Sequence, residues 1–119
     1  MLKMGMAQEV AKLREWEKEA KGSKERIAKQ HTLGKLIARE RLDILLDKDT
    51  FVELDMFAQH QCHDFGMEKI RPWGDAVVTG YGRINGRKVF VVAQDFTALG
   101  GSAGPVHINK ICQIIRKAR

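Results

Sequence analysis

The chain has 119 residues, of which 44% are hydrophobic and 30% are charged, a composition typical of one globular domain or part of one. No apolar run approaches the roughly 18 residues that a membrane-spanning helix needs, so we expect no membrane span. The acid-rich start lacks the apolar segment of a signal peptide, and we therefore expect a cytoplasmic protein.

The net charge of +6 is unevenly distributed along the chain. Residues 1–48 carry 12 basic and 8 acidic groups, whereas residues 107–119 carry 4 basic groups and no acidic group. Basic ends can attract nucleic acid, but the N-terminal charges are mixed in sign and no aromatic residues are interleaved for base stacking. We expect no nucleic-acid partner, whereas phosphorylated small molecules such as coenzyme A are compatible with this charge.

The first part of the chain is predicted to be helical. Helix-forming residues dominate residues 6–21, with apolar positions at three- and four-residue spacing. Gly22 ends this helix, and Ser23 is suited to cap a second one. Residues 35–47 show the clearest amphipathic pattern. Its apolar stripe consists of Leu36, Ile37, Leu42, Leu45 and Leu46.

The middle of the chain contains a short apolar segment and a long connection. Residues 50–57, TFVELDMF, favour a short strand or an extended docking segment. Residues 58–74 lack periodicity, and a connection of this length is often functional or partner-facing. His60, Cys62 and His63 could ligate a metal, but the group spans four residues and lacks a distant fourth ligand, so we assign no metal site.

A β-hairpin is predicted between Ala76 and Asp95. Asn85-Gly86 is a strong signal for a type I′ turn, because both central positions of that turn need positive φ. The second strand, residues 87–95, contains the continuous apolar run VFVVA, which suits a strand covered on both faces. Gly80 and Gly82 in the first strand indicate a bulge or a close backbone approach.

An amphipathic helix follows from Pro105 to the last residue. Its apolar face carries Ile108, Ile111, Cys112 and Ile115. We expect Cys112 in the core, because a free cysteine packs as a small hydrophobe. A strand buried on both sides needs neighbours that one hairpin does not supply, so the chain is predicted to open a larger α/β domain.

The segment GGSAG, Gly100 to Gly104, joins the hairpin to this helix and has three possible interpretations. It can be a structural turn, a cradle of backbone N–H groups at a helix start, or a G-x-S-x-G nucleophile elbow. The elbow fails because an acid and a histidine must follow Ser102, and the remaining residues contain His107 but no acid. The residues alone leave the turn and the cradle open.

Three segments of the chain resemble the N-terminal part of the acyl-CoA carboxyltransferase family, which includes propionyl-CoA carboxylase β subunits and methylmalonyl-CoA decarboxylase α subunits. The segments are residues 29–57, 60–87 and 89–111, and the phrases ARER, GDAVVTGYGRINGR and QDFT followed by GGS are typical of the family. The resemblance implies an N-terminal helical segment over residues 1–48. It also implies an α/β segment over residues 49–119, which opens an incomplete crotonase-like domain.

The resemblance implies transfer of a carboxyl group between carboxybiotin and the α-carbon of an acyl-CoA such as propionyl-CoA. The enolate of such a reaction depends on fixed N–H donors more than on an acid–base pair. Glu40 and Asp43 share one helix face, but the neighbouring arginines indicate surface ion pairs. The resemblance places Gly100, Gly101 and Ser102 near the acyl-CoA and assigns no catalytic residue and no metal to this chain.

The same resemblance implies which partners the chain has and which part of the family's site it lacks. Biotin would be carried on a separate protein or domain, so the expected partners are acyl-CoA and a biotin carboxyl carrier or biotin carboxylase subunit. The full-length parent is expected to be a homo-oligomer. A second glycine pair of the family, in a DSGGAR-like segment, lies beyond residue 119, and Pro105 replaces an expected polar residue. We therefore expect the chain alone to be inactive; the alternative is a non-catalytic docking module or remnant of a carboxylase or decarboxylase complex.

Overall fold

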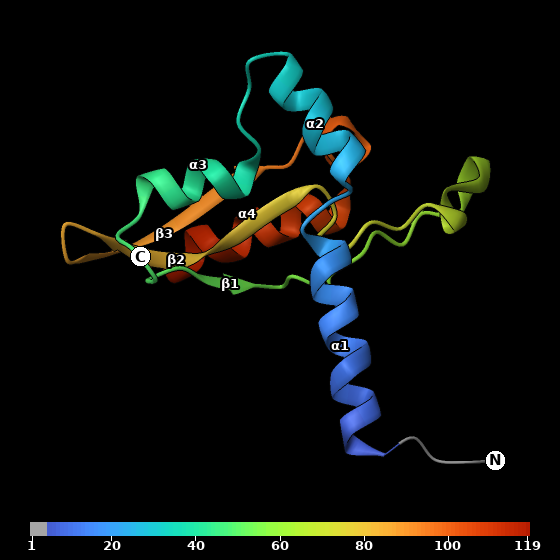
Figure 1. The fold of residues 1–119 in the computed structure, drawn as a ribbon, viewed down its shortest axis with the longest axis horizontal. Coiled ribbons are helices and arrows are strands. Elements are labelled where there is room, and N and C mark those ends of the chain that lie inside the picture. The colour runs from blue at the N-terminus through green and yellow to red at the C-terminus, as the bar shows by residue number, and fades with distance from the viewer. Residues whose placement is uncertain (1–4) are drawn as a thin grey trace.

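The computed structural model describes residues 5–119 as helices arranged around a small antiparallel sheet (Figure 1). The α-helices are α1 (Met6–Ala20), α2 (Lys24–Thr32), α3 (Ala38–Leu45) and α4 (Pro105–Lys117). The strands are β1 (Val52–Leu54), β2 (Val77–Ile84) and β3 (Arg87–Gln94), and the 3-10 helices η1 (Asp64–Lys69) and η2 (Leu99–Gly101) lie in connections. Helices followed by strands and a final helix confirm the predicted α/β class. No helix in these residues is long and apolar enough to cross a bilayer.

The sheet has the order β1-β2-β3, so β2 is its central strand. Val77, Val78 and Thr79 of β2 are almost completely buried. The sequence predicted that β3 is covered on both faces, and both α3 and α4 do contact it. However, Val92 of β3 is exposed, because β3 forms an edge of the sheet within residues 5–119. The most buried strand is therefore β2.

The hydrophobic core lies between α3 and one face of the sheet. Ala38, Leu42 and Leu46 follow one another at four-residue spacing, which places them on the same side of the helix. They pack against Val78 of β2 and Val91 of β3. Helix α4 packs on the same two strands from the other side of the sheet (Figure 1). The strands that lead into the glycine-rich turn are thus fixed by helices on both sides.

Helix α3 is shorter than the predicted range of residues 35–47. It begins after Ile37, whose amide donates to Oε2 of Glu40 at 3.0 Å. It ends at Leu46, whose backbone is extended. Glu40 also pairs with Nε2 of His31 at 2.8 Å, and Arg39 pairs with Glu53 of β1. Both ion pairs therefore lead away from α3, not along its surface as predicted.

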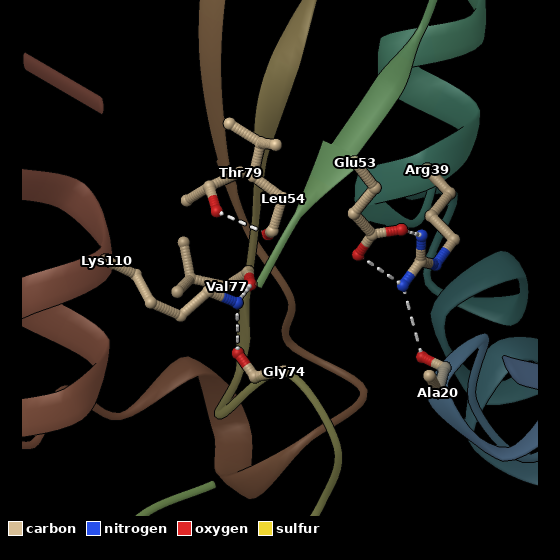
Figure 2. A network of polar contacts seen from close by, with 8 residues as sticks. All are labelled: Ala20, Arg39, Glu53, Leu54, Gly74, Val77, Thr79 and Lys110. Carbon is tan, nitrogen blue, oxygen red and sulfur yellow. Dashed lines mark hydrogen bonds and ion pairs between the residues drawn. The ribbon is translucent and has the colours of Figure 1, made fainter. Parts of the chain in front are cut away.

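Helix α1 extends away from the sheet and is attached near its C-terminal end (Figure 1). Trp16 packs against Trp73, with 5.1 Å between the ring centroids. Nη2 of Arg39 donates to the carbonyl of Ala20 at 3.3 Å, while the same guanidinium holds Glu53 (Figure 2). One arginine therefore connects α1, α3 and β1.

The hairpin turn confirms the prediction from Asn85-Gly86. Asn85 has a φ of 51° and Gly86 a φ of 79°, the positive values that a type I′ turn requires. The two amides of this turn donate to the carboxylate of Asp47, at 2.9 Å from Asn85 and 2.8 Å from Gly86. The tip of the hairpin is thus tied to the segment that follows α3.

The glycines of β2 allow neighbouring residues to approach the strand closely, and they do not form a bulge. The ladder between β2 and β3 is continuous from the pair Val77–Gln94 to the pair Ile84–Arg87. A Cβ at Gly80 would lie 2.1 Å from the carbonyl oxygen of Val52, so glycine lets β1 approach β2.

Replacing Gly80 with alanine is expected to destabilise the fold by about 1–3 kcal/mol or more, because the added methyl overlaps the backbone of β1. Urea denaturation followed by circular dichroism measures the change. Gly5→Ala is the control, since its Cβ would meet no atom within 4 Å. Equal stability of the Gly80→Ala variant and the wild type would contradict the close contact.

Candidate functional site

A pocket of about 480 Å³ lies where the 58–74 connection meets the start of α4. Its walls are mainly apolar. They include Met67, Leu99, Ala103, Pro105 and Val106, with polar groups from His60, Gln61, Asp75 and Ser102. No lysine or arginine belongs to this lining in the part of the chain that the structure describes. The pocket therefore suits a largely apolar ligand with a few hydrogen-bonding groups.

The glycine-rich turn reaches this pocket only through its second half. Leu99, Gly100 and Gly101 have positive φ values of 47°, 60° and 74°, so the chain turns sharply here. A Cβ at Gly101 would lie 2.8 Å from the ring of Phe96, so a side chain here would displace that ring in addition to straining the positive φ. Of the three residues expected near the ligand, Ser102 lines the pocket, whereas Gly100 and Gly101 shape the turn that leads to it.

The backbone amides of this turn divide into two groups. Those of Gly101 and Ser102 already donate to carbonyl groups within the turn, at 2.9 and 3.2 Å. Among residues 5–119, the amides of Ala103 and Gly104 donate to no protein acceptor, and both residues line the pocket. Within the same residues, the amide of Gly100 also has no protein acceptor but Gly100 lies outside the pocket lining, so the N–H groups available to a ligand in the pocket are those of Ala103 and Gly104. Their position directly before Pro105 is the signal that could have identified them.

A second turn contributes Asp75 to the wall of the pocket. Gly74, Asp75 and Ala76 have φ values of 82°, 48° and 63°, and the last two are unusual for residues with a side chain. Two side chains of α4 hold this turn, of which Figure 2 shows Lys110. Nδ1 of His107 donates to the carbonyl of Asp75 at 2.8 Å. Nζ of Lys110 donates to the carbonyls of Gly74 at 2.8 Å and Val77 at 2.7 Å.

These polar side chains are almost completely removed from solvent. The exposed fraction is 2% for Asp75, 0% for His107 and 3% for Lys110. Oδ2 of Asp75 and Nε2 of His107 have no hydrogen-bond partner among the described residues. None of the three was predicted from the sequence to belong to the site. His107 and Lys110 lie three apart on α4, and this spacing on a sheet-facing helix is the signal that could have found them.

Burial lowers the pKa of the Lys110 ammonium, because desolvation disfavours its charged form. The carboxylates of Glu53, Asp55 and Asp75 act in the opposite direction, whereas Arg39 lowers the pKa further. Two short hydrogen bonds to carbonyl oxygens compensate part of the burial. Lys110 is therefore a structural donor under the pocket and does not face a ligand.

The HQCH segment does not form a metal site in the described residues. Nε2 of His60 donates to the carbonyl of Ile70, and its Nδ1 accepts from the amide of Cys62 at 3.1 Å. Both ring nitrogens are thus occupied, which leaves no lone pair for a metal. Cys62 is exposed at the pocket, and Cys112 is only partly buried in α4, short of the core position expected for it.

Comparison with known proteins identifies the family. A model of the carboxyl transferase domain matches residues 29–119, more than half of the chain. The chain is 56% identical over 99 residues to the Homo sapiens mitochondrial propionyl-CoA carboxylase beta chain, an alignment that covers 82% of this chain and 18% of that protein. The carboxyltransferase subunit of Haloferax mediterranei propionyl-CoA carboxylase is 50% identical over 117 residues, which covers 97% of this chain and 23% of that subunit. The chain belongs to the carboxyl transferase domain family.

The fold agrees with this assignment. A transcarboxylase 12S crystal structure, with methylmalonyl-coenzyme A and methylmalonic acid bound, superimposes with a TM-score of 0.92 and 40% sequence identity. The superposition covers 98% of this chain and 23% of that one. The chain spans about a fifth of the length of the curated relatives that it matches. The family resemblance inferred from the sequence is confirmed.

Replacing Lys110 with methionine is expected to change how stability depends on pH. Because the pKa of Lys110 is lowered in the folded state, the unfolded chain binds more protons between that pKa and the ordinary value of 10.5. The wild type should therefore gain stability as pH rises through the folded pKa towards 10.5, and Lys110→Met should lack this gain. At pH 7 the variant should lose about 1–3 kcal/mol, because buried carbonyls lose their donor.

Urea unfolding at several values between pH 7 and pH 10 measures this difference. Lys117→Met, at an exposed position of the same helix, is the matched control and should show the pH dependence of the wild type. Parallel stability curves for the wild type and Lys110→Met would contradict the lowered pKa.

Proposed function

We propose that this chain forms the start of a biotin-dependent acyl-CoA carboxyltransferase and that its pocket contacts the acyl-CoA. The observation that carries the proposal is the uninterrupted match of residues 29–119 to the carboxyl transferase domain, together with the propionyl-CoA carboxylase relatives. Methylmalonyl-coenzyme A bound to a transcarboxylase of closely similar fold supports the ligand class. The mainly apolar pocket, lined by two residues whose amides have no protein acceptor among residues 5–119, is consistent with such a ligand.

The proposed reaction transfers a carboxyl group between carboxybiotin and the α-carbon of an acyl-CoA such as propionyl-CoA. Negative charge then develops on the thioester oxygen, where fixed N–H donors are effective. The donors that this chain presents are the amides of Ala103 and Gly104 and the hydroxyl of Ser102. Their proposed role is to bind and orient polar groups of the acyl-CoA. No side chain of this chain is assigned as a catalytic acid or base.

Biotin is the cofactor that the family implies, carried by another protein or domain. Among the described residues, the pocket lining contains the carboxylate of Asp75 and no cationic side chain. This lining does not fit the anionic carboxyl group of carboxybiotin, so we assign the pocket to acyl-CoA and no residue of this chain to biotin. The biotin carrier or carboxylase partner, the homo-oligomeric parent and the cytoplasmic location remain predictions.

Propionyl-CoA is expected to bind the chain at the glycine-rich turn. Titration of isotope-labelled protein should shift the amide resonances of residues 100–104 in nuclear magnetic resonance spectra. Gly101→Ala should weaken binding about tenfold or more, because a Cβ at this position meets the Phe96 ring at 2.8 Å and displaces the turn. Gly34→Ala is the matched control, since it also changes a glycine with positive φ but meets no atom within 4 Å. Saturable binding with unchanged resonances at residues 100–104 would place the ligand elsewhere.

The 119-residue chain alone is expected not to carboxylate propionyl-CoA, because it spans about a fifth of the length of its carboxyltransferase relatives. Incorporation of radiolabelled bicarbonate, measured with a biotin carboxylase and a biotinylated carrier, checks this expectation. A complete propionyl-CoA carboxylase in the same mixture is the positive control. Turnover by the purified chain would show that these residues hold the whole catalytic machinery and would contradict the proposal.

A further inference from the structure

We propose that Asp75 is a ligand-binding residue of the pocket, whose carboxylate accepts a hydrogen bond from an N–H group in the pantetheine arm of the acyl-CoA. The inference rests on the proposed function, because it takes acyl-CoA as the ligand. It adds a binding residue on the turn before β2, in the same pocket lining as Ser102. It also assigns the pantetheine arm of acyl-CoA to this pocket.

The side chain of Asp75 has an oxygen atom without a hydrogen-bond partner. Asp75 is 2% exposed and belongs to the wall of the pocket together with Ser102 and Gly104. Its Oδ2 atom is buried and has no hydrogen-bond partner among the described residues. Buried polar atoms are normally hydrogen-bonded, because removing a carboxylate from water without compensation is costly. A donor group on a ligand would supply the missing partner once the Asp75 side chain turns this oxygen towards the pocket that it lines.

The turn that carries this carboxylate is strained. Asp75 and Ala76 have φ values of 48° and 63°, a conformation that costs roughly 1–2 kcal/mol for each residue with a side chain. His107 and Lys110 maintain the turn through three hydrogen bonds to its carbonyl groups and those beside it. Backbone strain that the surroundings over-determine in this way is found preferentially at ligand sites.

His107 and Lys110 are positioning residues in this arrangement. Neither side chain belongs to the pocket lining, and both act on the backbone that carries Asp75. Because Nδ1 of His107 donates to a carbonyl, the imidazole proton is fixed on that nitrogen. The direction of the Asp75 side chain is thus set from α4, beneath the pocket.

The chemistry of the pocket lining indicates which part of acyl-CoA binds there. A buried carboxylate repels phosphate, and no lysine or arginine of the described residues lines the pocket to offset this repulsion. The phosphates of coenzyme A are therefore excluded from this position. The Oδ2 atom of Asp75 is a hydrogen-bond acceptor, so its missing partner is a donor. The pantetheine arm combines amide N–H groups with methylene groups, which match the apolar residues of the lining.

The test compares fragments of the ligand. Calorimetric titration of the chain with propionyl-CoA, propionyl-pantetheine and adenosine 3′,5′-bisphosphate gives three dissociation constants. Asp75→Asn should weaken the first two about tenfold or more and leave the third unchanged, because a hydrogen bond to a charged acceptor is lost. Asp49→Asn is the matched control: it removes the same charge at an exposed residue that also has positive φ, in the turn between α3 and β1.

A measurement on the wild type keeps the test decisive if Asp75→Asn does not fold. The carboxyl carbon resonance of Asp75 should shift with propionyl-pantetheine at the same concentrations as the amide of Ser102. If Ser102 shifts and Asp75 does not, the inference is overturned while the proposed function stands. If the bisphosphate alone shifts Asp75, the donor is the adenine amine and the pantetheine assignment is wrong. If propionyl-CoA shifts neither residue, both the inference and the proposed acyl-CoA site fall.

Discussion

The arrangement of the pocket depends on one buried ammonium group. Lys110 reaches from α4 to the carbonyls of Gly74 and Val77, which flank the left-handed residues before β2 (Figure 2). A lysine is rarely buried, because the charge must be compensated by strong acceptors. Here the compensation comes from backbone carbonyls that would themselves be buried without donors. The lysine and the turn therefore stabilise one another, and neither is expected to keep its conformation alone.

This mutual dependence links the sheet to the ligand site. Strand β2 starts directly after the turn, and Thr79 of β2 donates to the carbonyl of Leu54 in β1 at 3.0 Å (Figure 2). The same strand is the centre of the sheet and the partner of both other strands. Helix α4 begins in the wall of the same pocket and supplies the lysine. A change in the turn would thus be transmitted to the sheet and to the helix.

Local pattern predicted most of the elements correctly, because those elements depend on nearby residues. Helical periodicity identified α1 and α4, and Asn85-Gly86 identified the hairpin through the positive φ that its turn needs. The length of α3 was overestimated, because Glu40 binds the amide of Ile37 and so fixes the helix start after Ile37. Strand order was also missed, since the pairing of β1 with β2 depends on contacts between distant residues.

The candidate site was harder to predict for the same reason. Ser102 could be proposed from the glycine-rich segment and the family resemblance, and the structure places it in the pocket wall. Asp75 could not, because its backbone conformation is held by His107, 32 residues later in the chain. A left-handed aspartate next to a left-handed alanine has no signal in local sequence preferences. Only the packing of α4 against the start of β2 creates this wall.

The carboxylate of Asp47 couples the closing of the hairpin tip to the position of the segment that follows α3. Tips of two-stranded hairpins generally open first, since few contacts hold them. In this chain the amides of Asn85 and Gly86 bind a side chain almost forty residues earlier, at 2.9 and 2.8 Å. The tip therefore closes fully only when the end of α3 has reached the sheet. The most local turn of the fold is coupled to one of its long-range contacts, and the hairpin and α3 are expected to open and close as one cooperative unit.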